Sequence, residues 1–241
     1  MSDAAAHSHH AERTGPERYL QHHFQSVAQQ TEASTMGMWC FLAQEVMFFG
    51  GLFVSYAVYR YLYPEVWHAG SMHLPVIPGM INTIVLLLSS FSMAMGVYYT
   101  QIGNNKRLIW CLVLTLLLGL LFVAIKLQFE YLPKFEGGVI PGKYWNPHGH
   151  YAALADPAIT KPAQLFFFLY FLMTGMHAFH MLIGFAILLV LIYGATQKWF
   201  GPDRYVTIEY FGLYWHFVDI VWVFLFPLWY LVGNPLAPGH L

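Results

Sequence analysis

Five long runs of apolar residues alternate with shorter polar segments along the chain. Each run reaches or exceeds the roughly 20 helical residues that cross a hydrocarbon core of ~30 Å. Apolar strands would leave their backbone groups unsatisfied in lipid, and the alternating pattern of a barrel is absent from the sequence. The pattern predicts an all-α, polytopic membrane helix bundle with five transmembrane helices, at about 35–63, 77–101, 106–131, 162–194 and 205–232.

Polar segments separate these runs and divide the chain. "GNNK" lies between the second and third runs, "GPDR" lies between the last two, and the one long connection is 132–161. We expect a polar N-terminal tail at 1–33, a single transmembrane bundle at 34–233 and a C-terminal tail at 234–241. The N-terminal tail lacks the apolar core of a secretory signal, so we expect no cleaved leader.

Small and polar side chains recur every three or four residues within each run. Residues at this spacing share one face of a helix, and small or polar faces favour contact with other helices over contact with lipid. We therefore expect these stripes to face the interior of one compact bundle. They are Gly37, Phe41, Gln44, Glu45, Phe48, Gly51 and Leu52; Asn82, Ser89, Ser92 and Gly96; Thr115, Gly119, Phe122, Lys126 and Glu130; Thr174, His177, Met181 and Gly184; and Glu209, Gly212, His216 and Asp219.

The distribution of Lys and Arg predicts the orientation of the chain. With the N-terminus inside, six of these residues fall on the inner face and four on the outer face. Because basic residues favour the cytoplasmic side, we expect a cytoplasmic N-terminus and a C-terminus outside. Aromatic residues at the ends of the runs, Trp229 and Tyr230 among them, suit the interfacial belts. The inner residues are Arg13, Arg18, Lys106, Arg107, Lys198 and Arg204, and the outer ones are Arg60, Lys134, Lys143 and Lys161.

The composition agrees with a membrane protein. The chain is 58% hydrophobic and only 10% charged, whereas soluble domains carry about 25% charged residues. The formal net charge of −1 comes without a basic stripe, which excludes nucleic acid as a partner. Cys40 and Cys111 both lie in apolar runs, so they form no disulfide framework.

Several ionisable residues fall at membrane depth. Glu45 lies about ten residues into the first run, where a lone carboxylate costs ~3 kcal/mol or more on insertion scales. It is either a proton-handling or lipid-contacting group, or a carboxyl bonded to a histidine of a facing helix. Lys126 and Glu130 are four residues apart on one helix face and predict an ion pair. His216 and Asp219 also share a face and predict an internally satisfied polar patch, with a proton relay as the alternative.

Two histidines, His177 and His180, lie in the apolar segment "TGMHAFHMLIG". Either could face His216 and ligate a haem between the fourth and fifth helices, which would make the chain a small membrane cytochrome. However, histidines three residues apart diverge by about 60° on a helix, and neither an HExxH motif nor a Cys–His cluster is present. We therefore expect no metal site and no catalytic residue in this chain, with the histidines bonded inside the bundle. A free-standing proton transporter is a further alternative, but the inverted repeats frequent in transporters are missing from the sequence.

The five runs carry motifs that resemble, in the same order, those of subunit III of the haem-copper oxidases, the respiratory cytochrome c and quinol oxidases. The resemblance covers about Met36 to Gly233 and fits the five-helix form of the family. The motifs are "FLAQEVMFFGGLF", "INTIVLLLSS", "LTLLLGLLFVAIKLQFEY", "TGMHAFHMLIG" and "YWHFVDIVWVFLF".

The resemblance implies an accessory subunit of aerobic electron transport that packs on the catalytic subunit. Such a subunit binds no cofactor except structural phospholipid, which lies in a cleft between helices, and it supports proton uptake and enzyme lifetime. By motif position, Glu45, Phe41 and His180 are the lipid-cleft or proton-related residues. The implied interhelical polar set is His177, Glu130, Lys126, Glu209, His216 and Asp219.

The resemblance also implies partners and a location. Oxidase subunits I and II would carry the haem and copper, and a subunit IV and a quinol–cytochrome c reductase in a supercomplex are further implied partners. The expected location is the bacterial plasma membrane. Two basic residues of the family pattern are missing here, one of them replaced by Thr35, so we expect Lys198 or Arg204 to hold the lipid head group instead.

Overall fold

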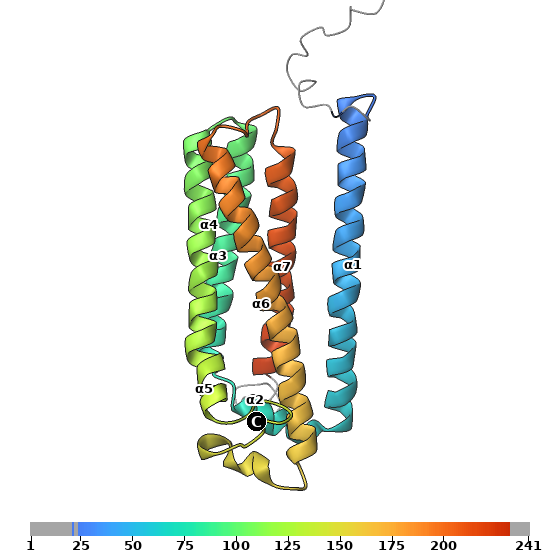
Figure 1. Cartoon of the computed structure of the whole chain (residues 1–241), viewed down its shortest axis with the longest axis vertical. Helices are drawn as coiled ribbons and strands as arrows, with labels where there is room; N and C mark the ends of the chain where they lie inside the picture. Colours follow the sequence, from blue (N-terminus) through green and yellow to red (C-terminus); the bar gives the residue numbers. More distant parts are fainter. Residues whose placement is uncertain (1–20, 22–23, 232–241) are drawn as a thin grey trace, which may run out of the picture.

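The computed structural model of the chain describes residues 21 and 24–231, and it is helical throughout its regular elements (Figure 1). The C-terminal tail expected at 234–241, most of the N-terminal tail, and Arg13 and Arg18 lie outside the described residues. Five helices are long and apolar enough to cross a membrane, which confirms the predicted fold class. They are α1 (Val27–Leu62), α3 (Val76–Gln101), α4 (Asn105–Lys126), α6 (Thr160–Thr196) and α7 (Val206–Tyr230).

The helices extend beyond the apolar runs at several ends. Helix α1 begins eight residues before the predicted span, because the Ser26 side chain accepts a hydrogen bond from the Gln29 backbone amide and caps its first turn. The first connection contains the short helix α2 (Pro64–Met72). Helix α4 continues through a π-helical turn (Leu127–Tyr131) into α5 (Leu132–Glu136), and a 3₁₀ helix (Gly149–Ala155) lies in the long connection.

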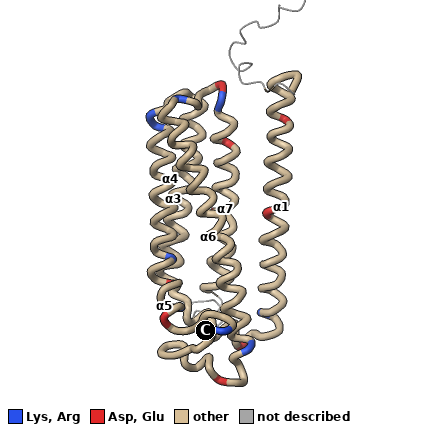
Figure 2. Tube along the Cα trace, viewed as in Figure 1, with Lys and Arg blue, Asp and Glu red and all other residues tan. Residues whose placement is uncertain are grey.

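Helices α3, α4, α6 and α7 form a closed four-helix bundle, in which each helix packs on two of the others. The predicted stripes of α3, α4 and α6 are buried in this bundle. In α7, Gly212 and Asp219 are buried, while Glu209 and His216 are partly exposed. Figure 2 shows that the charged residues gather mainly at the two ends of the helices.

Helix α1 stands beside this bundle against α6 and α7 (Figure 1). Its buried residues are Glu45, Phe49 and Tyr56. The prediction that its whole stripe faces inward is therefore wrong, since Gly37, Gln44 and Gly51 are exposed. Lipid is as apolar as a helix interface, so small residues alone did not determine which face of α1 packs.

Close packing in the bundle depends on glycines opposite large aromatic rings. A Cβ atom on Gly184 of α6 would lie 2.7 Å from the ring of Trp215, and one on Gly119 of α4 would lie 2.6 Å from the ring of Phe185. Both distances are too short for a side chain without movement of these buried rings. The two glycines therefore set how closely α4, α6 and α7 approach.

Two alanine substitutions on α6 should have opposite effects. Gly184→Ala should destabilise the chain, because overpacking costs about 1–3 kcal/mol, more than the helix-propensity gain of ~1 kcal/mol. Gly175→Ala should stabilise it by about 0.5–1 kcal/mol, since a Cβ there meets nothing within 4 Å. Thermal unfolding of the purified chain measures both effects, and equal shifts for the two variants would contradict the packing role of Gly184.

Candidate functional site

A carboxyl–imidazole pair joins α1 to the bundle. The Glu45 Oε2 and His180 Nε2 atoms are 3.0 Å apart, and both residues are buried. The other ring nitrogen of His180, Nδ1, lies 2.8 Å from the Met176 carbonyl oxygen. Because a carbonyl only accepts hydrogen bonds, Nδ1 carries a proton. The contact between Nε2 and Oε2 then holds one further proton, either on the imidazole in an ion pair or on the carboxyl in a neutral pair.

This pair lines a cleft between α1, α6 and α7. The cleft has a volume of about 430 Å³. Most of its lining is apolar or aromatic, and the Tyr214 hydroxyl donates to the His180 carbonyl over 2.9 Å. The ring of Phe49 lies 5.2 Å from that of His180 and covers it from α1. The lining residues are Met38, Phe41, Glu45, His180, Ile183, Ile187, Thr207, Phe211 and Tyr214.

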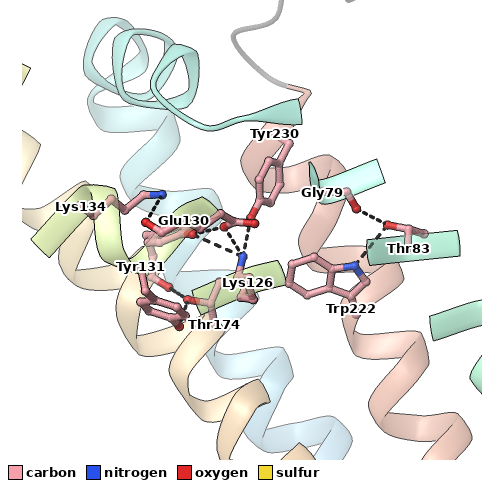
Figure 3. Close-up of polar contacts among 10 residues, drawn as sticks. Gly79, Thr83, Lys126, Glu130, Tyr131, Lys134, Thr174, Trp222 and Tyr230 are labelled. Atoms are coloured by element: carbon pink, nitrogen blue, oxygen red, sulfur yellow. Dashed lines mark hydrogen bonds and ion pairs between the residues drawn. The ribbon is translucent and has the colours of Figure 1, made fainter. Parts of the chain in front are cut away.

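A second polar group is enclosed where α4, α6 and α7 meet (Figure 3). Lys126 and Glu130 form the predicted ion pair, and both side chains are buried. The hydroxyls of Tyr170 and Tyr230 donate to the same carboxylate oxygen of Glu130, and the Lys126 ammonium also contacts the Tyr230 hydroxyl. The ammonium lies 4.5 Å from the centre of the Trp222 ring, which adds a cation–π contact.

The π-helical turn helps to assemble this cluster. It ends two residues before Pro133, which has no backbone N–H to continue the α-helical ladder. Lys134 follows, and its ammonium donates to the Glu130 carbonyl over 3.2 Å and lies 4.7 Å from the Tyr170 ring centre. Two lysine side chains and one glutamate side chain are thus buried together.

The remaining predicted polar residues occupy three different places. His216 Nδ1 lies 2.7 Å from the Ser90 hydroxyl of α3. The His177 ring lies between Phe122 and Trp222, and neither His177 nor the carboxylate of Asp219 has a hydrogen-bond partner among the described residues. Glu209 lies in the first turn of α7, where the helix dipole favours a carboxylate.

Two of the three histidines of the haem hypothesis have different neighbours in the structure. His180 pairs with Glu45 of α1, and His216 contacts Ser90 of α3, so these two imidazoles have different neighbours. Among residues 21 and 24–231, no group of three or more His, Cys, Asp or Glu is arranged to hold a metal ion.

Two further histidines meet in the connections outside the membrane spans. The rings of His73 and His150 lie 4.6 Å apart at a steep angle, and the Tyr151 ring lies 5.0 Å from His73. Burial lowers the pKa of His73 below its ordinary value, and His150 and Lys134 lower it further. Burial also raises the pKa of Tyr151. The His73 ring thus packs from the α2–α3 turn against His150 and Tyr151 of the long connection.

Sequence reasoning missed four members of the buried cluster. Tyr230 was assigned to an interfacial belt and Lys134 to the outer face, yet both side chains are about 1% exposed or less. Tyr170 and Trp222 lie in apolar runs, where aromatic residues pack against protein or lipid equally well. Only their depth in the membrane could have identified Tyr170 and Trp222 from the sequence. A buried Lys126 requires polar or aromatic partners at the same depth on the facing helices.

Comparison with known proteins supports a single family. The family model described as cytochrome c oxidase subunit III matches residues 153–234, which include α6 and α7. The "Probable quinol oxidase subunit 3" of Staphylococcus aureus (strain USA300) is 29% identical over 217 residues, covering 86% of this chain and 93% of that protein. The protein of the same name from Staphylococcus haemolyticus (strain JCSC1435) is 29% identical over 219 residues, with the same coverage. Together with the five apolar helices, these matches make the chain similar to subunit III of the haem-copper oxidases.

Proposed function

We propose that the Glu45–His180 cleft is the functional site of this oxidase subunit, and that it binds a phospholipid and supports proton uptake. The single observation that carries this proposal is a carboxyl–imidazole pair, with its atoms 3.0 Å apart, in the wall of an otherwise apolar cleft. A volume of about 430 Å³ falls within the ~300–1,000 Å³ typical of small-molecule sites.

The cleft suits the acyl part of a lipid. It lies between membrane-spanning helices, and its walls are formed mainly by apolar and aromatic side chains. An acyl chain in the cleft would exclude water from Glu45 and His180 and strengthen their mutual contact. For the head group we keep the prediction that Lys198 or Arg204 contacts the phosphate.

The pair also suits a role in proton uptake. A group that takes up or releases a proton inside the membrane needs a partner that can carry the charge, and here the two atoms are 3.0 Å apart. The other ring nitrogen of His180 is engaged by the Met176 carbonyl, so Nε2 is the ring atom that faces Glu45. The hydrogen-bonded pair is therefore suited to passing a proton between these two atoms.

The chain is an integral membrane protein that associates with other oxidase subunits. We propose that these are subunits I and II, which carry haem and copper, together with a subunit IV, and that this chain holds no haem or metal of its own. We further propose an N-terminus in the cytoplasm of a bacterial cell, a location in its plasma membrane and membership of a respiratory supercomplex. The relatives are named for quinol oxidases and the family for cytochrome c oxidase, so both electron donors need to be assayed.

Glu45→Gln tests the function of the cleft. The amide can still hydrogen-bond His180 but cannot ionise, so we expect normal assembly, normal haem content of the complex and a normal initial rate of oxygen consumption. Proton uptake should slow, and the active lifetime during sustained turnover should shorten severalfold. Oxygen consumption followed to inactivation measures this change, together with proton uptake in reconstituted vesicles.

Glu32→Gln is the matched control, because Glu32 is an exposed carboxyl on the same helix. It should leave both the initial rate and the lifetime unchanged. Loss of haem from the Glu45→Gln complex would show an assembly role instead, and a lifetime equal to that of wild type would rule out the proposed role of Glu45.

A further inference from the structure

The centre of the four-helix bundle contains a group of buried polar atoms without partners. They are both side-chain polar atoms of Asn82, both ring nitrogens of His177 and both carboxylate oxygens of Asp219. The three residues are 0%, 1% and 3% exposed, and they come from α3, α6 and α7. None of them lines the Glu45–His180 cleft.

Trp222 lies close to each of these three residues, either in space or along the chain. Its ring lies 5.5 Å from that of His177, and its Nε1 donates to the hydroxyl of Thr83, the neighbour of Asn82, over 3.2 Å (Figure 3). Asp219 precedes Trp222 by three residues and so lies one turn away on the same side of α7. His177 and Thr83, the neighbour of Asn82, thus contact Trp222 directly, and Asp219 lies one helical turn from it on α7.

We propose that the surroundings of Trp222 bind internal water molecules, held by Asn82, His177 and Asp219. A polar group enclosed without a hydrogen bond costs several kcal/mol in an apolar medium, and lipid supplies no donor or acceptor. Waters buried in proteins make about three hydrogen bonds each to groups of this kind. The imidazole of His177 and the amide of Asn82 each need a hydrogen-bond donor and a hydrogen-bond acceptor as partners. A water molecule can serve as either.

The neighbouring side chains offer these atoms few partners, because the Ser90 hydroxyl beside Asp219 is already 2.7 Å from His216 Nδ1. The Trp222 Nε1 atom is already bonded to Thr83, and Phe122 has no polar atom. Lys126 is bound to Glu130 and to the Tyr230 hydroxyl. Oε1 of Glu130 is also buried without a partner, and the Lys126 ammonium lies 4.5 Å from the centre of the Trp222 ring. The water site thus extends from His177 towards the Lys126–Glu130 pair.

X-ray radiolytic labelling of the purified oxidase complex in H₂¹⁸O tests the proposal. Water bound inside a protein yields hydroxyl radicals in place, so ¹⁸O should appear on Trp222 and His177, which mass spectrometry detects. Met93 is the internal control, because it is 0% exposed and methionine is readily oxidised. Label on Trp222 with none on Met93 supports the site, and equal absence of label from all three residues overturns the proposal.

Two variants make the test specific. Asp219→Leu should abolish the label on Trp222, whereas Asp219→Asn, which keeps hydrogen-bonding atoms, should retain it. Should Asp219→Leu fail to assemble, a density map of the wild-type complex that resolves water decides the question. Water density within hydrogen-bonding distance of His177 or Asp219 supports the proposal, and direct contacts among Asn82, His177 and Asp219 with no water density overturn it.

Discussion

Replacing Glu130 with leucine should destabilise the chain by about 3–5 kcal/mol, the usual effect of removing one partner from a buried ion pair. The Lys126 ammonium is buried, and in the variant its remaining partners would be tyrosine hydroxyls and aromatic rings. Tyr170 and Tyr230 would also lose the acceptor that they share. Thermal unfolding of the purified chain in detergent, followed by circular dichroism, measures the change.

Two further variants identify the cause of that effect. Glu136→Leu removes an exposed carboxylate six residues away and should change stability by no more than about 0.5 kcal/mol. The double variant Lys126→Met/Glu130→Leu should recover much of the loss, because it replaces both charges with apolar side chains of similar volume. An equally large loss in the double variant would show that packing, and not the unpaired charge, explains the single variant.

The membrane spans could be predicted because a backbone in lipid can satisfy its hydrogen bonds only in a helix or a closed barrel. An apolar run as long as 106–131 has to be helical to satisfy its backbone, so its length alone identified a span. The helical period then placed Thr115, Lys126 and Glu130 on one face, and all three side chains are buried. Both predictions needed only local sequence, and both are confirmed.

The contacts between helices could not be predicted in the same way. Leu and Phe are equally stable against lipid and inside the bundle, so the apolar pattern does not mark the inner face of α1 or α6. The sequence left open whether Glu45 handles protons or bonds a histidine, and the structure shows a bond to His180 from a residue 135 positions away. The partners of Glu130 on α6 and α7 depend in the same way on which helices become neighbours.

Tyr56→Ala should have the second large effect, a loss of about 3–5 kcal/mol as for other buried aromatic side chains. The Tyr56 ring lies 4.8 Å from Trp229 and 6.2 Å from Trp67, and its hydroxyl donates to the Leu228 carbonyl. Because α1 buries few other side chains, we expect the half of α1 near Tyr56 to separate from α7 while the four-helix bundle stays folded. Hydrogen exchange of α1 peptides should accelerate, and that of α6 peptides should not.

Tyr61→Ala is the matched control for this local effect. It makes the same chemical change on the same helix, at a side chain that is 86% exposed. It should leave the exchange of α1 peptides and the unfolding temperature close to those of the wild-type chain. If Tyr56→Ala instead accelerates exchange equally in α1 and α6, the docking of α1 and the folding of the bundle form one cooperative unit. In that case α1 stabilises the whole fold, and loosening of α1 would disturb the Lys126–Glu130 cluster as well as the Glu45–His180 cleft.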